Sequence, residues 1–312
     1  MIHVVCPNPA LDRTIYVNKF IQNGVCRAQS SKDLLGGKGF NVILSYLTEK
    51  ERLDFRIHTF IGGYTGTYLA QLIQQENIPC SVTKINGTTR ICSIIVDEAQ
   101  QHAHLINENG PFIEEDEKSQ FIHQLINAVG SGDIVIFSGS LPQGIDEDFY
   151  YQLTHTLQEK GAKCILDTSG FSLKEGVKAK PWLVKVNESE FFDLIEKQEH
   201  KAEKQDVIES LRNLDLEWNF IVTLGGKGSI AKFDQEIYEV TLPRITAKNA
   251  TASGDIFLGA LSKGLANNLT IEEALIQAST YSLSNCMYWH PHIDLSDVEI
   301  YKSQIQITKI GG

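Results

Sequence analysis

Six short apolar runs rich in β-branched residues recur between segments with helical spacing. They lie at 2–6, 57–61, 134–137, 164–166, 183–186 and 220–224. Strands that are apolar on both faces and alternate with helices are typical of a mostly parallel sheet covered on both sides. At 312 residues the chain is long enough for one large α/β domain. We therefore predict a single α/β domain spanning residues 1–312.

Two regions depart from this pattern of apolar strands, because apolar and polar residues alternate along them. These regions are 14–20 and 91–106. Strands that alternate in this way are usually covered on one face only. We predict that segments of approximately 12–34 and 84–108 form a small, separate antiparallel sheet, which closes over the main domain as a lid.

The segment 249–255 (Asn-Ala-Thr-Ala-Ser-Gly-Asp) combines small residues with one carboxylate where a helical pattern begins. Apolar residues at 257, 258, 261 and 265 follow at helical spacing, so 252–255 should form the first turn. We expect an ordinary helical φ at Ala252, and a positive φ, which is costly for a residue with a Cβ, is the alternative. N–H groups in a first turn lack intrahelical partners and attract anions. A carboxylate there would repel a phosphate unless it had a proton to collect. The segment therefore predicts phosphoryl transfer to a hydroxyl.

Composition limits the partners of the chain. A formal net charge of −11 argues against nucleic acid as the main partner, so positive charge for an anionic ligand must be local. No apolar run approaches the roughly 20 residues of a membrane helix, and the N-terminus lacks a signal layout, so we expect a cytoplasmic protein without a membrane partner. The six cysteines form no C-x-x-C pair and should be reduced thiols. The mixed Glu and Lys segment 197–204 should lie on the surface.

Two common nucleotide fingerprints are missing. The string Leu-Gly-Gly-Lys-Gly occurs at 35–39 and at 224–228, but a glycine follows each lysine, so neither copy fits a P-loop. The first strand is followed by Pro-Asn-Pro and not by G-x-G-x-x-G. These departures weaken a P-loop NTPase and a nicotinamide-dependent oxidoreductase.

Four motifs in a fixed order point to a family. They are 8–12 (Asn-Pro-Ala-Leu-Asp), 36–41 (Gly-Gly-Lys-Gly-Phe-Asn), 138–142 (Ser-Gly-Ser-Leu-Pro) and 253–255 (Ser-Gly-Asp). With them the chain resembles the ribokinase-like, PfkB-type sugar kinases, within which it is closest to the 1-phosphofructokinase and tagatose-6-phosphate kinase branch. The resemblance implies a ribokinase-like three-layer α/β sandwich, with a mainly parallel central sheet and a small β lid.

The resemblance also implies the residues of the phosphoryl-transfer site. Asp255 would take the proton from the acceptor hydroxyl, and Ala252, Ser253 and Gly254 would supply the anion hole. From the residues alone, a helix cap and close packing remain alternatives. Two departures from the family pattern are Ala252, where glycine is usual, and Val186, where proline is usual.

The same resemblance assigns the sugar and its phosphate. Asp12, Gly37 and Asn41 would bind the sugar hydroxyls, although an Asx turn would also explain Asp12. Lys38 and Arg90 would clamp the phosphate already on the sugar, with Arg27 as a third cation.

For the nucleotide, the resemblance implies Asn187, Thr223, Gly225 and Gly228. Asn187 and Glu190 would hold Mg²⁺ through water, which suits a cation that keeps several waters. An Asn helix cap completed by Glu190 is the structural alternative. Asp167 ends a strand at the same sheet edge, and its role stays open.

The implied reaction transfers the γ-phosphoryl group of ATP, with Mg²⁺, to a ketohexose monophosphate. Fructose 1-phosphate ranks first as the acceptor and tagatose 6-phosphate second. A catalytically weak sugar-phosphate sensor of the same fold is an alternative, for which Ala252 is the support. Open edges of the lid strands are compatible with a homodimer that pairs its lids.

Overall fold

The computed structural model describes residues 1–48, 53–196, 204–214 and 218–311. The predicted surface segment lies outside the described residues except for its last residue. Within the described part, ten strands form one sheet in the order β14-β13-β12-β11-β10-β9-β8-β1-β4-β5. Their bounds are β1 Ile2–Cys6, β4 Phe55–Gly62, β5 Cys80–Ile85, β8 Ile134–Ser138, β9 Lys163–Asp167, β10 Leu183–Asn187, β11 Asn219–Thr223, β12 Ser229–Phe233, β13 Glu236–Thr241 and β14 Gln306–Lys309.

The seven strands from β11 to β5 are parallel, and β12, β13 and β14 add an antiparallel edge. Each of the six predicted runs lies in or overlaps one of the parallel strands, so the predicted mainly parallel sheet is confirmed. Parallel strands present their carboxyl ends at one edge, where ligands bind in open α/β sheets.

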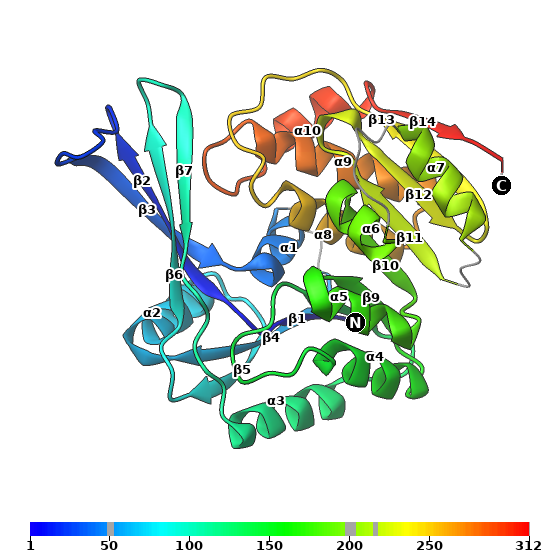
Figure 1. Cartoon of the computed structure of the whole chain (residues 1–312), viewed down its shortest axis with the longest axis horizontal. Helices are drawn as coiled ribbons and strands as arrows, with labels where there is room; N and C mark the ends of the chain where they lie inside the picture. The colour runs from blue at the N-terminus through cyan, green and yellow to red at the C-terminus, as the bar shows by residue number, and fades with distance from the viewer. Residues whose placement is uncertain (49–52, 197–203, 215–217, 312) are drawn as a thin grey trace.

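Helices cover both faces of the sheet and complete three layers (Figure 1). Because side chains of a strand alternate between faces, β1 places Val4 in one hydrophobic core and Val5 in the other. The first core contains α1 (Lys38–Leu47), α2 (Gly63–Gln75), α8 (Ser253–Ala266), α9 (Ile271–Cys286) and α10 (Leu295–Lys302). The second contains α3 (Glu115–Ala128), α4 (Phe149–Glu159), α5 (Gly170–Gly176), α6 (Glu188–Leu194) and α7 (Lys204–Asn213). None of the helices described is both long and apolar enough to cross a bilayer.

The lid is a second sheet, which the described residues build from four strands in the order β3-β2-β6-β7 (Figure 1). The strands are β2 Ala10–Val17, β3 Ala28–Gly36, β6 Arg90–Asp97 and β7 His102–Asn107. The prediction of an antiparallel lid was wrong at its centre, because β2 and β6 pair in parallel. The physical reason is that β2 continues from β1 and β6 follows β5. Since β1 and β5 belong to the parallel part of one sheet, the β2–β3 and β6–β7 hairpins leave that sheet in the same direction.

The packing of α1 against α8 sets the distance between residues on these two helices. A Cβ on Gly259 of α8 would lie 2.0 Å from the carbonyl oxygen of Val42 in α1. The hydroxyl groups of Tyr46 and Ser262 lie 2.6 Å apart across the same contact, and both side chains are buried. The two helices therefore touch through backbone at Gly259, which only glycine permits.

We expect Gly259→Ala to lower the free energy of unfolding by about 3 kcal/mol, at the upper end of overpacking costs, because the backbone of α1 must move away. Alanine in a helix interior is about 1 kcal/mol more favourable than glycine, and the clash must outweigh this gain in stability. Urea denaturation measures the change. Gly130→Ala is the matched control, since its Cβ would meet only the carboxylate of Asp133 at 3.4 Å. Equal stability of the two variants would contradict the close contact.

Candidate active site

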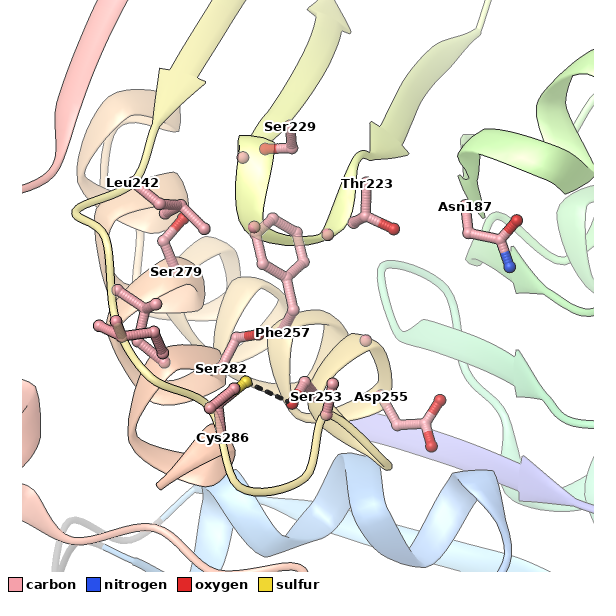
Figure 2. A pocket seen from close by; sticks show the side chains of 18 of the residues that line it. Asn187, Thr223, Ser229, Leu242, Ser253, Asp255, Phe257, Ser279, Ser282 and Cys286 are labelled. Carbon is pink, nitrogen blue, oxygen red and sulfur yellow. Dashed lines mark hydrogen bonds between the residues drawn. The ribbon is translucent and has the colours of Figure 1, made fainter. Parts of the chain in front are cut away.

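Two cavities meet at the carboxyl edge of the sheet. The larger, of about 600 Å³, extends along the β11–β12 turn and helices α8 and α9 (Figure 2). The smaller, of about 330 Å³, lies between the main sheet and the base of the lid. Lys38, Gly254 and Asp255 line both cavities. Two ligands could therefore occupy separate spaces and react where these three residues lie.

Helix α8 begins one residue later than predicted, because Ala252 is its N-cap and has φ 67° and ψ −9°. The expectation of an ordinary helical φ was therefore wrong. The N–H of Ser253 donates to the carbonyl of Ala250 (3.2 Å), which closes a turn with Ala252 at its third position. These angles are those of a type II turn, which requires a positive φ there.

This turn determines which backbone N–H groups remain available at the helix N-terminus. The N–H groups of Asp255 and Ile256 both donate to the carbonyl of Ala252, at 3.0 and 2.9 Å. Among the described residues, no acceptor binds the N–H groups of Ala252 and Gly254. Both residues line the smaller cavity, and Gly254 also lines the larger. Two unpaired N–H groups and the helix dipole together make this a site for an anion.

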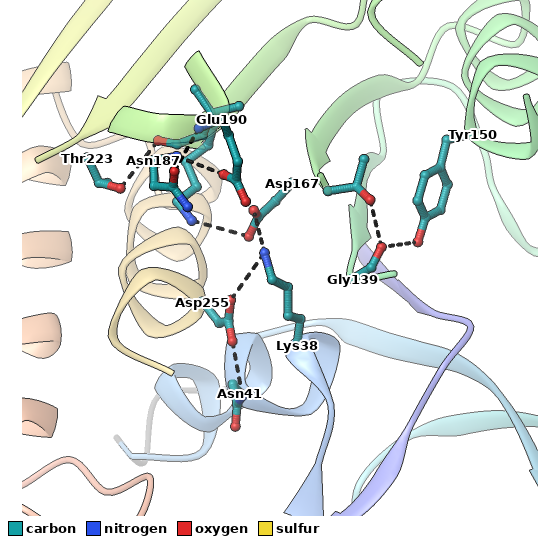
Figure 3. A network of polar contacts seen from close by, with 12 residues as sticks. Lys38, Asn41, Gly139, Tyr150, Asp167, Asn187, Glu190, Thr223 and Asp255 are labelled. Atoms are coloured by element: carbon teal, nitrogen blue, oxygen red, sulfur yellow. Dashed lines mark hydrogen bonds and ion pairs between the residues drawn. The ribbon is translucent and has the colours of Figure 1, made fainter. Parts of the chain in front are cut away.

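Asp255 lies buried at the meeting point of the cavities. Asn41 donates through Nδ2 to its Oδ2 (3.0 Å), and Nζ of Lys38 lies 4.0 Å from its Oδ1 (Figure 3). Burial raises the pKa of Asp255 to about 6, with Lys38 opposing the rise and the carboxylate of Asp167 adding to it. A carboxylate that titrates near neutral pH is suited to accept a proton.

Asp167, whose role the sequence left open, is fully buried between two lysines. Its Oδ1 lies 3.1 Å from Nζ of Lys38 (Figure 3), and its Oδ2 lies 3.4 Å from Nζ of Lys185. Burial alone would raise the pKa of Asp167, but the two ammonium groups outweigh burial and lower it. Burial would likewise lower the pKa of Lys38, but Asp167 and Asp255 outweigh it and raise that pKa. Asp167 and Lys38 are therefore both charged at neutral pH.

Sequence reasoning missed Lys185. The available signal was a lysine inside the apolar run of β10, since a charged side chain in a buried strand needs a partner. Its Nζ lies 3.0 Å from the position that a Cβ on Gly254 would take. Glycine at 254 thus leaves room for a buried ammonium group directly beside the N-terminus of α8.

The predicted sugar residues Asp12, Gly37, Asn41 and Arg90 come together along the smaller cavity, beside Lys38. Burial raises the pKa of Asp12 to about 7, with Arg90 opposing and Asp255 adding to the rise. The guanidinium group of Arg90 donates to three carbonyl oxygens, of Asn8 (2.9 Å), Glu108 (3.2 Å) and Pro9 (3.4 Å). These bonds fix the guanidinium at the wall of the cavity.

Arg27 is not brought to this site. It is exposed and lines neither cavity. The next residue, Ala28, pairs with Val17 at the far end of the lid, whereas Ala10 pairs with Gly36 at the cavity end. At about 3.3 Å per residue, this register separates the two ends by roughly 25 Å.

The predicted nucleotide residues Asn187, Thr223, Gly225 and Gly228 all line the larger cavity. Gly225 and Gly228 have positive φ values of 57° and 103°. A Cβ on Gly228 would lie 1.9 Å from the carbonyl oxygen of Val240, so this turn requires glycine. The hydroxyl of Thr223 donates to the carbonyl of Val186 (3.3 Å), which joins β11 to β10.

Asn187 and Glu190 form the helix cap that was the structural alternative. Oδ1 of Asn187 accepts from the N–H of Glu190 (2.9 Å), and Oε2 of Glu190 accepts from the N–H of Asn187 (2.8 Å). The described residues leave Oε1 of Glu190 without a hydrogen bond, and both side chains line the larger cavity. No cluster of three or more His, Cys, Asp or Glu side chains in the described part of the chain could hold a metal ion directly. The residues therefore suit a Mg²⁺ ion that keeps most of its waters.

Comparison with known proteins agrees with this geometry. Residues 5–286 match the model of the pfkB family carbohydrate kinases. Tagatose-6-phosphate kinases from two strains of Staphylococcus epidermidis are 34% identical to the chain, over 99% of its length and 100% of theirs.

Two solved structures show the same fold. Phosphofructokinase-2 from Escherichia coli, in complex with substrates and products, is 24% identical with a TM-score of 0.89 and covers 97% of this chain and 98% of its own. Ribokinase from Thermotoga maritima is 19% identical with a TM-score of 0.72, over 96% of this chain and 98% of its own. The predicted ribokinase-like fold is thus confirmed, and the chain belongs to the pfkB family of carbohydrate kinases, which are phosphotransferases that use ATP.

Proposed function

We propose that the protein transfers the γ-phosphoryl group of ATP to the C1 hydroxyl of tagatose 6-phosphate, forming tagatose 1,6-bisphosphate. The observation that carries this proposal is the position of Asp255, a buried carboxylate beside two unpaired N–H groups where two cavities meet. The motifs ranked fructose 1-phosphate first, but the relatives at 34% identity favour tagatose 6-phosphate. Fructose 1-phosphate is therefore the second candidate.

In this reaction ATP occupies the larger cavity and the sugar phosphate the smaller. The acceptor oxygen attacks the γ-phosphorus and forms the new P–O bond, while its proton passes to Asp255. The bond between the γ-phosphorus and the bridging oxygen breaks, and its electron pair stays on ADP. The N–H groups of Ala252 and Gly254, together with Lys38 and Lys185, stabilise the charge on the moving phosphoryl group.

Asn187 and Glu190 are the residues that would hold Mg²⁺, through its waters. When bound, the ion neutralises negative charge on the phosphates of ATP. The free Oε1 of Glu190 is the acceptor that such a water needs. The carboxylates of Asp167 and Asp255 are held by Lys38 and Asn41 and keep their places without a metal.

We also propose that two chains associate through their lids. The outer strands β3 and β7 have open edges, and the lid exposes apolar side chains. These exposed residues are Ile21, Val25, Leu105 and Ile106. Open edges and apolar side chains favour pairing with a second copy. A role for Arg27 in binding the sugar phosphate would require such a partner, because within one chain it lies away from both cavities.

A panel of acceptors tests the proposed reaction. With ATP and Mg²⁺, we expect tagatose 6-phosphate to give the highest kcat/KM, followed by fructose 1-phosphate, with free tagatose and fructose far behind. Coupled measurement of ADP formation gives the values. A free sugar as the best acceptor would overturn the proposal, and no turnover with any acceptor would favour the sensor alternative.

Asp255→Asn keeps the size of the side chain but removes the base, so kcat should fall by about 10² to 10⁴-fold with little change in KM for ATP. Because the base acts when ionised and its pKa is raised to about 6, kcat/KM of the parent should fall about tenfold per pH unit below that value. Steady-state kinetics between pH 5 and 8 measure both. Asp12→Asn removes the other carboxyl group whose pKa is raised, and kcat/KM of this variant should still decline below about pH 6. If the decline of kcat/KM near pH 6 disappeared in Asp12→Asn, the titration would belong to Asp12.

Arg90→Ala should lower kcat/KM for the sugar phosphate by roughly 10 to 100-fold, because a charge-assisted contact in a desolvated site contributes about 1.5 to 3 kcal/mol. The KM for ATP and the rate with free sugars should change little, which distinguishes lost phosphate binding from a disturbed fold. Arg212→Ala removes an exposed arginine on α7 and serves as the control. An equal loss with phosphorylated and free sugars would contradict the proposed clamp.

A further inference from the structure

The turn that carries Ala252 is tied to the end of α9 by a buried side chain. Nδ2 of Asn285, which is 1% exposed, donates to the carbonyl of Thr251 and to Oγ of Ser253, each at 2.8 Å. Its Oδ1 accepts from the N–H of His292 (3.1 Å). Asn285 thus holds the residue on each side of Ala252 and is itself held by the segment that follows α9.

Neighbouring contacts fix the same turn from further sides. Oδ1 of Asn249 accepts from the N–H and the hydroxyl of Thr251, at 3.0 and 2.7 Å, while its Nδ2 donates to the carbonyl of Trp289 (2.8 Å). Oγ of Ser253 lies 3.1 Å from Sγ of Cys286 (Figure 2). Of the side chains in these contacts, Asn285 is the one that spans Ala252, because it binds both Thr251 and Ser253.

A left-handed conformation is unfavourable for alanine and persists only where the surroundings determine it. If Ala252 relaxed to a negative φ, the carbonyl of Ala252 would turn and the pairing of the N–H groups in the first turn of α8 would change. The N–H groups of Ala252 and Gly254 would then no longer be held in their present positions along the smaller cavity. A displacement of about 1 Å at a reacting centre can cost roughly 100-fold in rate.

We infer that Asn285 is a positioning residue for phosphoryl transfer, which keeps Ala252 left-handed and thereby aims the two unpaired N–H groups at the transferring phosphoryl group. Asn285 lines neither cavity, so it would act through the turn and not through a direct contact with a ligand. The inference rests on the proposed function for its kinetic consequence. Its structural part, that Asn285 determines φ at residue 252, stands on the hydrogen bonds alone.

Asn285→Ala tests the inference, with Ser284→Ala as the matched control. Ser284 is the preceding residue of α9 and is also buried, but it bonds to Asp294 and Asp297 and not to the turn. We expect Asn285→Ala to lower kcat about 10 to 100-fold with both KM values within about threefold, since the binding contacts lie elsewhere. Ser284→Ala should lower the melting temperature without this loss of kcat. Equal effects of both variants on kcat, or an unchanged kcat in Asn285→Ala, would overturn the inference.

Ala252→Gly should compensate in part for the loss of kcat in Asn285→Ala. A merely structural role of Asn285 would not produce this compensation. Glycine adopts a positive φ readily, so it needs Asn285 less. Asn285→Ala should therefore lower kcat about tenfold less in an Ala252→Gly background than in the parent background. The same change in both backgrounds would contradict the inference.

Crystal structures of the parent and of Asn285→Ala separate this inference from the proposed function. We expect residue 252 to leave the left-handed region in the variant. If φ stays near 67° there, the inference fails whatever the parent phosphorylates. If the parent phosphorylates no sugar while residue 252 relaxes in Asn285→Ala, the proposed function fails and Asn285 still determines the turn.

Discussion

The two ion pairs of the buried Asp167 hold the active site together. Lys38 comes from the N-terminus of α1, Asp167 from the end of β9 and Lys185 from β10, so one carboxylate connects three elements. Removing one partner of a buried pair leaves an uncompensated charge, which is strongly destabilising. The carboxylate keeps two ammonium groups beside the N-terminus of α8, in a chain whose net charge is −11. Local positive charge for a phosphate is thus built into the fold.

Much of the fold could be predicted, because buried parallel strands have a strong local signal. The run 2–6 coincides with β1, and the other five runs lie within or overlap single strands. The parallel pairing of β2 with β6 could not be read from alternation, since alternation reports burial of one face and not the direction of a neighbouring strand. Strand β3, with five exposed residues, had no apolar pattern to detect.

The site shows the same division between local and non-local information. Asp255, Lys38 and Asn41 belong to short motifs, and the structure brings them together. The φ of Ala252 belongs to a turn whose restraints include Asn285, which lies 34 positions along the chain from Thr251, so no local pattern could give it. Lys185 escaped notice because its partner Asp167 lies on another strand. Asn187 and Glu190 fitted two readings equally, and the helix cap became visible only in three dimensions.

The parallel pairing at the centre of the lid also constrains how the chain folds. Strand β2 is made early but cannot complete its sheet until β6 has formed, and β4, α2 and β5 lie between them in sequence. Contacts between residues far apart in sequence form slowly, because a long loop must close first. During synthesis, the β2–β3 hairpin is therefore made before β6, the strand that pairs with the inner edge of β2. The cover of the active site thus depends on contacts between residues 80 positions apart, such as Ala10 and Arg90, although its first strand begins at residue 10.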